Sequence, residues 1–169
     1  MSVGDGPAPV SRDRRGAGGA SHEIWVTAAS PAVIGAGAED PTTGSLTVPP
    51  PRLGTRIRIN EFLPGHLDDR GLQSPVHRTE SIDYGIVLDG QITLLLDDEE
   101  VTAHAGDIII QRGTDHAWAN RGDTVARVAF ILVGGTFGDD VLEALPADVR
   151  ESLMTHGPRD GAAAKGEPA

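Results

Sequence analysis

Residues 77–90, HRTESIDYGIVLDG, join a polar leading end to a run that is typical of a β-strand. Alternate residues of a strand face the same side, so this stretch has two different faces. One face is polar from His77 to Asp83, with small Ser81 between them, whereas the other is apolar from Ile82 to Leu88. An ordinary half-buried strand turns its apolar face to the core and its polar face to water. The alternative is that the polar face lines a cavity and performs chemistry there.

A second histidine, His116, opens a later strand-like run that also carries Trp118 and Asn120 on the same face. If the two strands are neighbours inside a barrel, His77, Asp83 and His116 form a two-histidine, one-carboxylate set. Such a set binds a divalent metal and leaves positions open for substrate. Without metal, the same residues form a His–Asp acid–base pair. Taken singly, each histidine is more often a surface or satisfied core residue, and spacing alone does not show that the strands are neighbours.

The segments around this stretch indicate an all-β domain. Residues 55–62, TRIRINEF, alternate with a period of two, which is typical of a strand with two different faces. After Gly90, the short runs ITLLL, VTAH, IIIQ, HAWAN and VARVAFILV are separated by the turn signals DDEE, AGD, RGTD and RGD. Short strands with turns every six to ten residues are typical of an antiparallel barrel or sandwich. Residues 139–155 have apolar side chains at helical spacing and are interrupted by Pro146, which predicts short helical turns.

Composition sets the limits of this domain. The chain has 169 residues, enough for one domain with tails. Residues 1–20 and 156–169 are rich in Gly, Ala and Pro without periodicity and are predicted to be disordered, which leaves 21–138 for the barrel. A net charge of −11 argues against nucleic-acid and acidic-membrane partners. With no apolar run typical of a signal peptide or a membrane span, the expected location is cytoplasmic.

Two stretches, 77–90 and GDIIIQRGTDHAWAN at 106–120, resemble the two sequence motifs of the cupin superfamily. The first cupin motif usually reads Gly, five residues, His-x-His, three or four residues, Glu, six residues, Gly. Anchoring it on Gly90 places Asp83 at the glutamate, Thr79 at the second histidine and His77 at the first. In the second motif the matching residues are Gly106, Gly113, His116 and Asn120. The resemblance covers about residues 55–133 and implies a single jelly-roll antiparallel β-barrel whose polar strand face looks inward.

The resemblance also implies a site, with two departures from the family pattern. Thr79 replaces one of the usual histidines, and Asp83 replaces the glutamate. What remains is a metal site with His77, Asp83 and His116 as ligands for Zn, Fe, Ni or Mn, or no metal at all. Metal-free cupins occur in the sugar-epimerase branch of the family, where an acid–base pair acts instead. Small cupins are usually homodimers, so a homodimer is expected as well.

Four further residues are candidate substrate contacts. Arg58 and its neighbour Arg56 project from one strand face; facing inward they would bind an anionic group, and facing outward they would be solvated. The hydroxyl of Thr79 is expected to bind substrate or a water. Trp118 either stacks on a substrate ring or fills the barrel, and Gln111 either hydrogen-bonds substrate or stabilises a turn.

The function predicted from these features is that of a small-molecule enzyme. The leading prediction is a lyase, a dehydratase or decarboxylase, acting on an oxygenated carboxylate or polyketide-like substrate. The resemblance supports this, since small single-domain cupins of secondary metabolism include dehydratases, decarboxylases and cyclases. An iron-dependent dioxygenase, an isomerase and a non-catalytic small-molecule-binding barrel are the alternatives.

Overall fold

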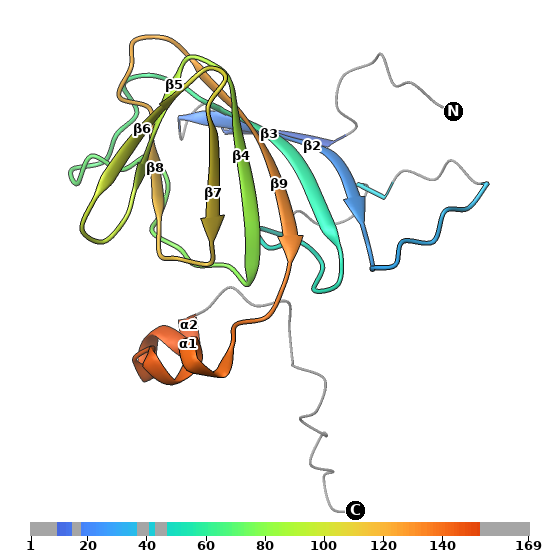
Figure 1. Cartoon of the computed structure of the whole chain (residues 1–169). Coiled ribbons are helices and arrows are strands. Elements are labelled where there is room, and N and C mark those ends of the chain that lie inside the picture. The colour runs from blue at the N-terminus through green and yellow to red at the C-terminus, as the bar shows by residue number, and fades with distance from the viewer. Residues whose placement is uncertain (1–9, 15–17, 37–40, 43–46, 153–169) are drawn as a thin grey trace, which may run out of the picture.

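The computed structural model describes residues 10–14, 18–36, 41–42 and 47–152. Within them the chain forms two antiparallel sheets, one of six strands in the order β1-β2-β3-β9-β4-β7 and one of three strands in the order β6-β5-β8 (Figure 1). The strands are β1 (Val10–Arg14), β2 (Gly19–Thr27), β3 (Thr55–Phe62), β4 (Ser81–Asp89), β5 (Gln91–Leu95), β6 (Glu100–His104), β7 (Ile108–Arg112), β8 (Ala117–Ala119) and β9 (Ala126–Gly134). This arrangement confirms the predicted all-β jelly-roll barrel.

The hydrophobic core lies between the two sheets. Strand β9 shows why: its alternate residues Val128, Phe130 and Leu132 are buried, as the period of two requires. They pack in one cluster with Ile92 of β5 and Trp118 of β8. The two sheets therefore enclose a single interior, closed on one side by aromatic and aliphatic side chains.

The turn between β4 and β5 depends on Gly90. Its φ is 69°, in the left-handed region, and a Cβ there would lie 2.6 Å from the carbonyl oxygen of Val125. Only glycine fits both conditions, so the glycine that closes the 77–90 stretch is required by the backbone.

Strands β3 and β4 turn their polar faces inward. On β4, Ser81 and Asp83 are buried, whereas Ile82 is exposed. On β3, Arg56 and Arg58 are buried. The cavity interpretation of the 77–90 stretch is therefore the one that the structure supports, and the expectation of a solvated arginine face is wrong.

The two ends of the chain differ from expectation in one respect. Strand β1 and the start of β2 lie within residues 1–20, which the sequence predicts to be disordered; the prediction is wrong for these residues, because β2 pairs with β3 and β1 pairs with β2, which orders a segment without a hydrophobic period of its own. Residues 1–9 and 156–169 lie outside the described residues. Two short helices, α1 (Asp139–Ala144) and α2 (Ala147–Ser152), follow β9 in the predicted helical segment and lie at one end of the barrel (Figure 1). No helix among the described residues has the length and apolarity to cross a membrane.

Candidate active site

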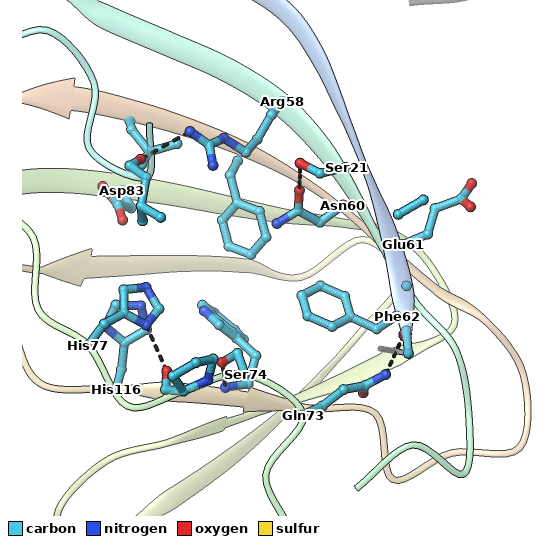
Figure 2. A pocket seen from close by; sticks show the side chains of 18 of the residues that line it. Ser21, Arg58, Asn60, Glu61, Phe62, Gln73, Ser74, His77, Asp83 and His116 are labelled. Carbon is cyan, nitrogen blue, oxygen red and sulfur yellow. Dashed lines mark hydrogen bonds between the residues drawn. The ribbon is translucent and has the colours of Figure 1, made fainter. Parts of the chain in front are cut away.

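A cavity of about 420 Å³ opens between the sheets. Its wall combines an imidazole pair, a carboxyl group, a guanidinium and an apolar surface (Figure 2). The lining includes the side chains of Ser21, Arg58, Asn60, Phe62, Gln73, His77, Asp83, His116, Trp118, Phe130 and Leu132. The volume suits a small molecule, because ligand pockets usually hold about 300–1,000 Å³.

The two predicted histidines meet in this cavity. His77 and His116 face each other across an isolated β-bridge, with ring centroids 4.3 Å apart and planes tilted by 49°. The Nδ1 of His77 lies 2.9 Å from the carbonyl oxygen of Pro75, and that of His116 lies 3.0 Å from the carbonyl oxygen of Thr114. A carbonyl oxygen only accepts, so each Nδ1 carries the proton and donates it. Each Nε2 is consequently left with its lone pair, as a base or a ligand atom.

Burial sets the charge state of His116. Its side chain is almost completely enclosed, and desolvation lowers the pKa of its imidazole to about 4. The neighbouring His77 lowers that pKa further, because two imidazolium ions this close repel, while the hydrogen bond to Thr114 and the charge of Asp115 act in the opposite direction. At neutral pH His116 is therefore an uncharged proton acceptor.

Asp83 belongs to a different wall and a different network. Its Oδ1 accepts a hydrogen bond of 2.6 Å from the hydroxyl of Ser81, which also lies 2.8 Å from the hydroxyl of Thr79. Burial raises the pKa of Asp83, opposed by that hydrogen bond and by the charges of Arg58 and His77. Figure 2 shows Asp83 across the cavity from the imidazole pair. The carboxyl group thus lies opposite the histidines, where burial favours its protonated form.

The described residues do not fit the predicted metal centre. Among the side chains that the structure places, no group of three or more His, Cys, Asp or Glu is close enough together to hold a metal ion. His77 and His116 are a pair, but Asp83 is held by Ser81 on the other wall. Asp is one methylene shorter than the family's Glu, and the carboxyl group of Asp83 is hydrogen-bonded to Ser81 of its own strand. The prediction of His77, Asp83 and His116 as one ligand set is therefore not supported by their geometry.

Arg58 lines the cavity and is held there by a buried ion-pair cluster. Its Nη2 donates to the carbonyl oxygens of Thr47 and Val48, both at 3.0 Å, and its Nε lies 3.2 Å from Oε1 of Glu23. Arg56 reaches the other oxygen of Glu23 at 3.3 Å and also binds the Thr47 carbonyl at 2.9 Å. Two guanidinium groups contact one carboxylate, and Arg58 brings its guanidinium to the cavity wall. No sequence motif indicated the role of Glu23, because its neighbours in β2 show no pattern that predicts a buried charge.

The other predicted contacts divide between cavity and framework. Trp118 lines the cavity and also belongs to the core, edge-on to Phe130 at 5.2 Å, so both of its expected roles coexist. Gln111 is not part of the cavity wall; its amide donates to the carbonyl and hydroxyl oxygens of Thr114, which is the turn role. Thr79 is buried behind Ser81 and does not line the cavity either.

Asn120, which matches the second motif, stabilises the barrel end. Its Nδ2 donates to the carbonyl oxygens of Phe62 and Thr124, both at 2.8 Å. Its backbone N donates to Oε1 of Gln73 at 2.9 Å, and Gln73 in turn donates to the carbonyl oxygens of Gly18 and Leu63. Gln73 was another residue that the sequence did not single out, because its three partners are distant in the chain.

Two antiparallel sheets around a mixed polar and apolar cavity define a β-barrel of jelly-roll type. More specifically, the chain belongs to the cupin superfamily: residues 66–133 match the family model described as Cupin domain. A Cupin 2 conserved barrel domain protein from Salinispora arenicola has the same fold, with a TM-score of 0.50 and 15% identity over 89% of this chain and 93% of that one.

Relatives at higher identity come from fungi. The chain is 36% identical over 139 residues to the phomopsin biosynthesis cluster protein C' of Diaporthe leptostromiformis, covering 79% of this chain and 66% of that protein. It is 38% identical over 84 residues to the cupin-domain-containing oxidoreductase fogC of Aspergillus ruber, covering 47% of this chain and 38% of that protein. The chain therefore spans about two thirds of the first relative and less than half of the second.

Proposed function

We propose that this protein is a small-molecule enzyme of secondary metabolism, a lyase that eliminates water from its substrate by proton transfer. The biosynthetic role is supported by the relatives, several of which are named for secondary-metabolite clusters. The reaction type rests on one observation: an uncharged imidazole and a buried carboxyl group face each other across an apolar cavity. Groups with such different environments are suited to act as base and acid at the same pH.

In the proposed reaction His116 is the base and Asp83, in its protonated form, is the acid. The Nε2 of His116 takes a proton from the carbon next to a carbonyl group. A double bond forms as the carbon–oxygen bond to a β-hydroxyl breaks, and the proton of Asp83 goes to that hydroxyl, which leaves as water. His116 then returns its proton to Asp83 through water, so the site is regenerated without any other reagent. His77 holds its partner ring in place and disfavours its protonated form before substrate binds.

The cavity wall indicates the kind of substrate. Phe62, Trp118, Phe130 and Leu132 give a flat apolar surface, which suits a conjugated or aromatic skeleton. The guanidinium of Arg58 at the cavity wall suits an ionised oxygen, a carboxylate or an enolate, and would also stabilise negative charge that develops on a carbonyl oxygen. A decarboxylation would use the same groups and is the nearest variant of this proposal.

An oxidoreductase is the second candidate, because three relatives carry that name. The alignments with them cover 47% of this chain. An oxygenase of the two-histidine, one-carboxylate type would need a third ligand beside His77 and His116, and Asp83 lies across the cavity from them.

The test is an assay on a panel of β-hydroxy ketones and β-hydroxy acids with aromatic substituents, followed by the absorbance of the conjugated product. We expect turnover with the wild type, a loss of at least a thousandfold in His116→Gln, and no change in His104→Gln, whose side chain is 66% exposed. Binding without turnover would favour the non-catalytic barrel. Oxygen consumption that requires added Fe²⁺ would favour the oxidoreductase. Metal analysis of untagged protein is expected to show well under one equivalent, and stoichiometric metal lost in His116→Gln would contradict the metal-free chemistry.

We also propose that the protein acts as a homodimer through the outer face of its six-stranded sheet. Strand pairing sets Ile57, Ile131, Tyr84 and Ile110 side by side in one row, and Ile59, Ala129, Ile86 and Ile108 in the next. The side chains of Ile108 and Ile110 are 62% and 59% exposed. A solvent-facing sheet normally carries polar side chains on this side, so these rows indicate a covered surface.

A second copy of the chain is the occupant that we propose for this face. Each row crosses the four strands β3, β9, β4 and β7, which at about 4.8 Å apart span about 19 Å. The two rows carry no charged residue despite the net charge of −11.

A further inference from the structure

The imidazole pair lies outside the regular strands of both sheets. His77 and His116 form an isolated bridge, in which each backbone N donates to the other's carbonyl oxygen at 3.0 Å. Strand β4 begins only at Ser81, and β8 begins at Ala117 and is three residues long. Within the bridge itself, one pair of backbone hydrogen bonds holds the two histidines side by side.

An ion pair lies next to this bridge. In antiparallel pairing the residues after His77 and before His116 also lie opposite each other, and these are Arg78 and Asp115. The guanidinium binds the carboxylate with both ends of its fork, Nε to Oδ1 at 3.1 Å and Nη2 to Oδ2 at 2.6 Å. The side chains are 14% and 27% exposed, and neither residue lines the cavity. This geometry is the strong, orientation-specific form of an ion pair.

The ion pair is placed to control the orientation of both rings. Asp115 is the one residue between His116 and Thr114, whose carbonyl oxygen accepts the Nδ1 proton of that histidine. Arg78 directly follows His77, whose Nδ1 donates to Pro75. Joining Arg78 to Asp115 fixes the backbone of both strands next to the bridge, and so fixes which nitrogen of each ring faces the cavity.

We propose that Arg78 and Asp115 are positioning residues that hold His77 and His116 with their Nε2 atoms in the cavity. They act from outside the cavity and do not touch substrate. The inference rests on the proposed function only in giving the imidazole pair a catalytic role; the orientation itself can be measured without any substrate.

The test is ¹⁵N NMR of the histidine side chains at neutral pH, which distinguishes a proton on Nδ1 from one on Nε2. Signals are assigned with His77→Gln and His116→Gln. The wild type is expected to show a single Nδ1–H form for both rings. In Arg78→Lys, which keeps the charge but not the fork, and in Asp115→Asn, we expect this signature to be replaced by averaged signals from both forms. The double variant is expected to be no worse than either single one, because both remove the same contact.

The matched control is Arg121→Lys, which breaks another two-point Arg–carboxylate pair, with Glu100, on the surface. It should leave the histidine signals unchanged, and thermal melting of each sample separates a loss of orientation from a loss of fold. Persistence of the single Nδ1–H form in both Arg78→Lys and Asp115→Asn would overturn the proposal. Failure of the proposed function would appear differently, as full turnover in His116→Gln whatever the NMR result.

Discussion

On β3 and the start of β4, the inner face of the six-stranded sheet is polar and the outer face is apolar. On the inner face, Arg58 and Asp83 are buried, together with the hydroxyl of Ser81. On the outer face of the same strands, Ile82 and Tyr84 are exposed. An antiparallel sheet with one solvated side normally shows the opposite pattern. The difference teaches that β3 and β4 are built for contents on the inside and for a cover on the outside.

The buried polar groups of the inner face are tolerated only because each of them has partners. A buried charge without partners is strongly unfavourable, whereas a paired and hydrogen-bonded one is tolerated. Glu23 and the carbonyl oxygens of Thr47 and Val48 provide this for Arg58, and Ser81 provides it for Asp83. Variants on each side of the sheet test this difference between the two faces.

Breaking the inner cluster is expected to have the largest effect. Arg58→Met keeps most of the side-chain volume but leaves Glu23 with one arginine in place of two. We expect a loss of about 3–5 kcal/mol in the free energy of unfolding, measured with urea, because a buried charge loses a partner. The control is Arg127→Met at the exposed pair with Glu61, where less than about 1 kcal/mol is expected. Equal losses in the two variants would contradict the cluster's role.

Lowering the pH should act on the inner face through His116. Its pKa of about 4 in the folded state lies below the ordinary value of 6.5, so the unfolded chain binds more protons between these values. Stability is therefore fully present above pH 6.5 and falls as the pH drops toward 4, by about 3 kcal/mol in all. Urea unfolding of wild type and His116→Asn at several pH values measures the difference. Parallel curves for the two proteins would show that His116 titrates normally.

Truncating the outer face should weaken self-association with little effect on the fold. Ile110→Ala removes an exposed aliphatic side chain from the β7 end of a row, which should raise the dimer dissociation constant about thirtyfold, the equivalent of about 2 kcal/mol. Sedimentation velocity over a dilution series measures this. Val101→Ala, an exposed aliphatic residue of the other sheet, should leave the constant unchanged. A monomeric wild type at all concentrations would refute the homodimer.

The smallest effect is expected where the outer face carries a hydroxyl. Tyr84 is exposed and lies on the side of β4 away from the cavity, so its phenol is not placed for proton transfer. Tyr84→Phe is expected to keep turnover on the hydroxy-ketone panel within twofold. A large loss would mean that the outer face takes part in the chemistry.

The sequence was sufficient for the barrel and for one half of the site. Alternation and turn signals predicted the strands from Thr55 onward, and the two family motifs placed His77, Asp83 and His116 around one cavity. The parts that failed depend on partners distant in the chain. The expected ligand set needed the direction of the Asp83 side chain, which Ser81 determines, and Glu23 gained its role only when β2 paired with β3. Strand β1 had no periodic signal because its order comes from its neighbour.

The amide of Gln73 has a consequence for how a molecule enters and leaves the barrel. Its side chain makes three hydrogen bonds, with Gly18, Leu63 and the backbone of Asn120, and so ties the loop of residues 63–73 to β8 and to the start of β2. The bonds with Gly18 and Asn120 join the loop to the rest of the barrel, and at about 1 kcal/mol each they disfavour swinging the loop aside by about 2 kcal/mol, or about thirtyfold. The loop is a fixed wall during most encounters. Substrate and product are therefore expected to pass through a different rim of the cavity. The rate of product release should depend on residues at that rim rather than on motion of this loop.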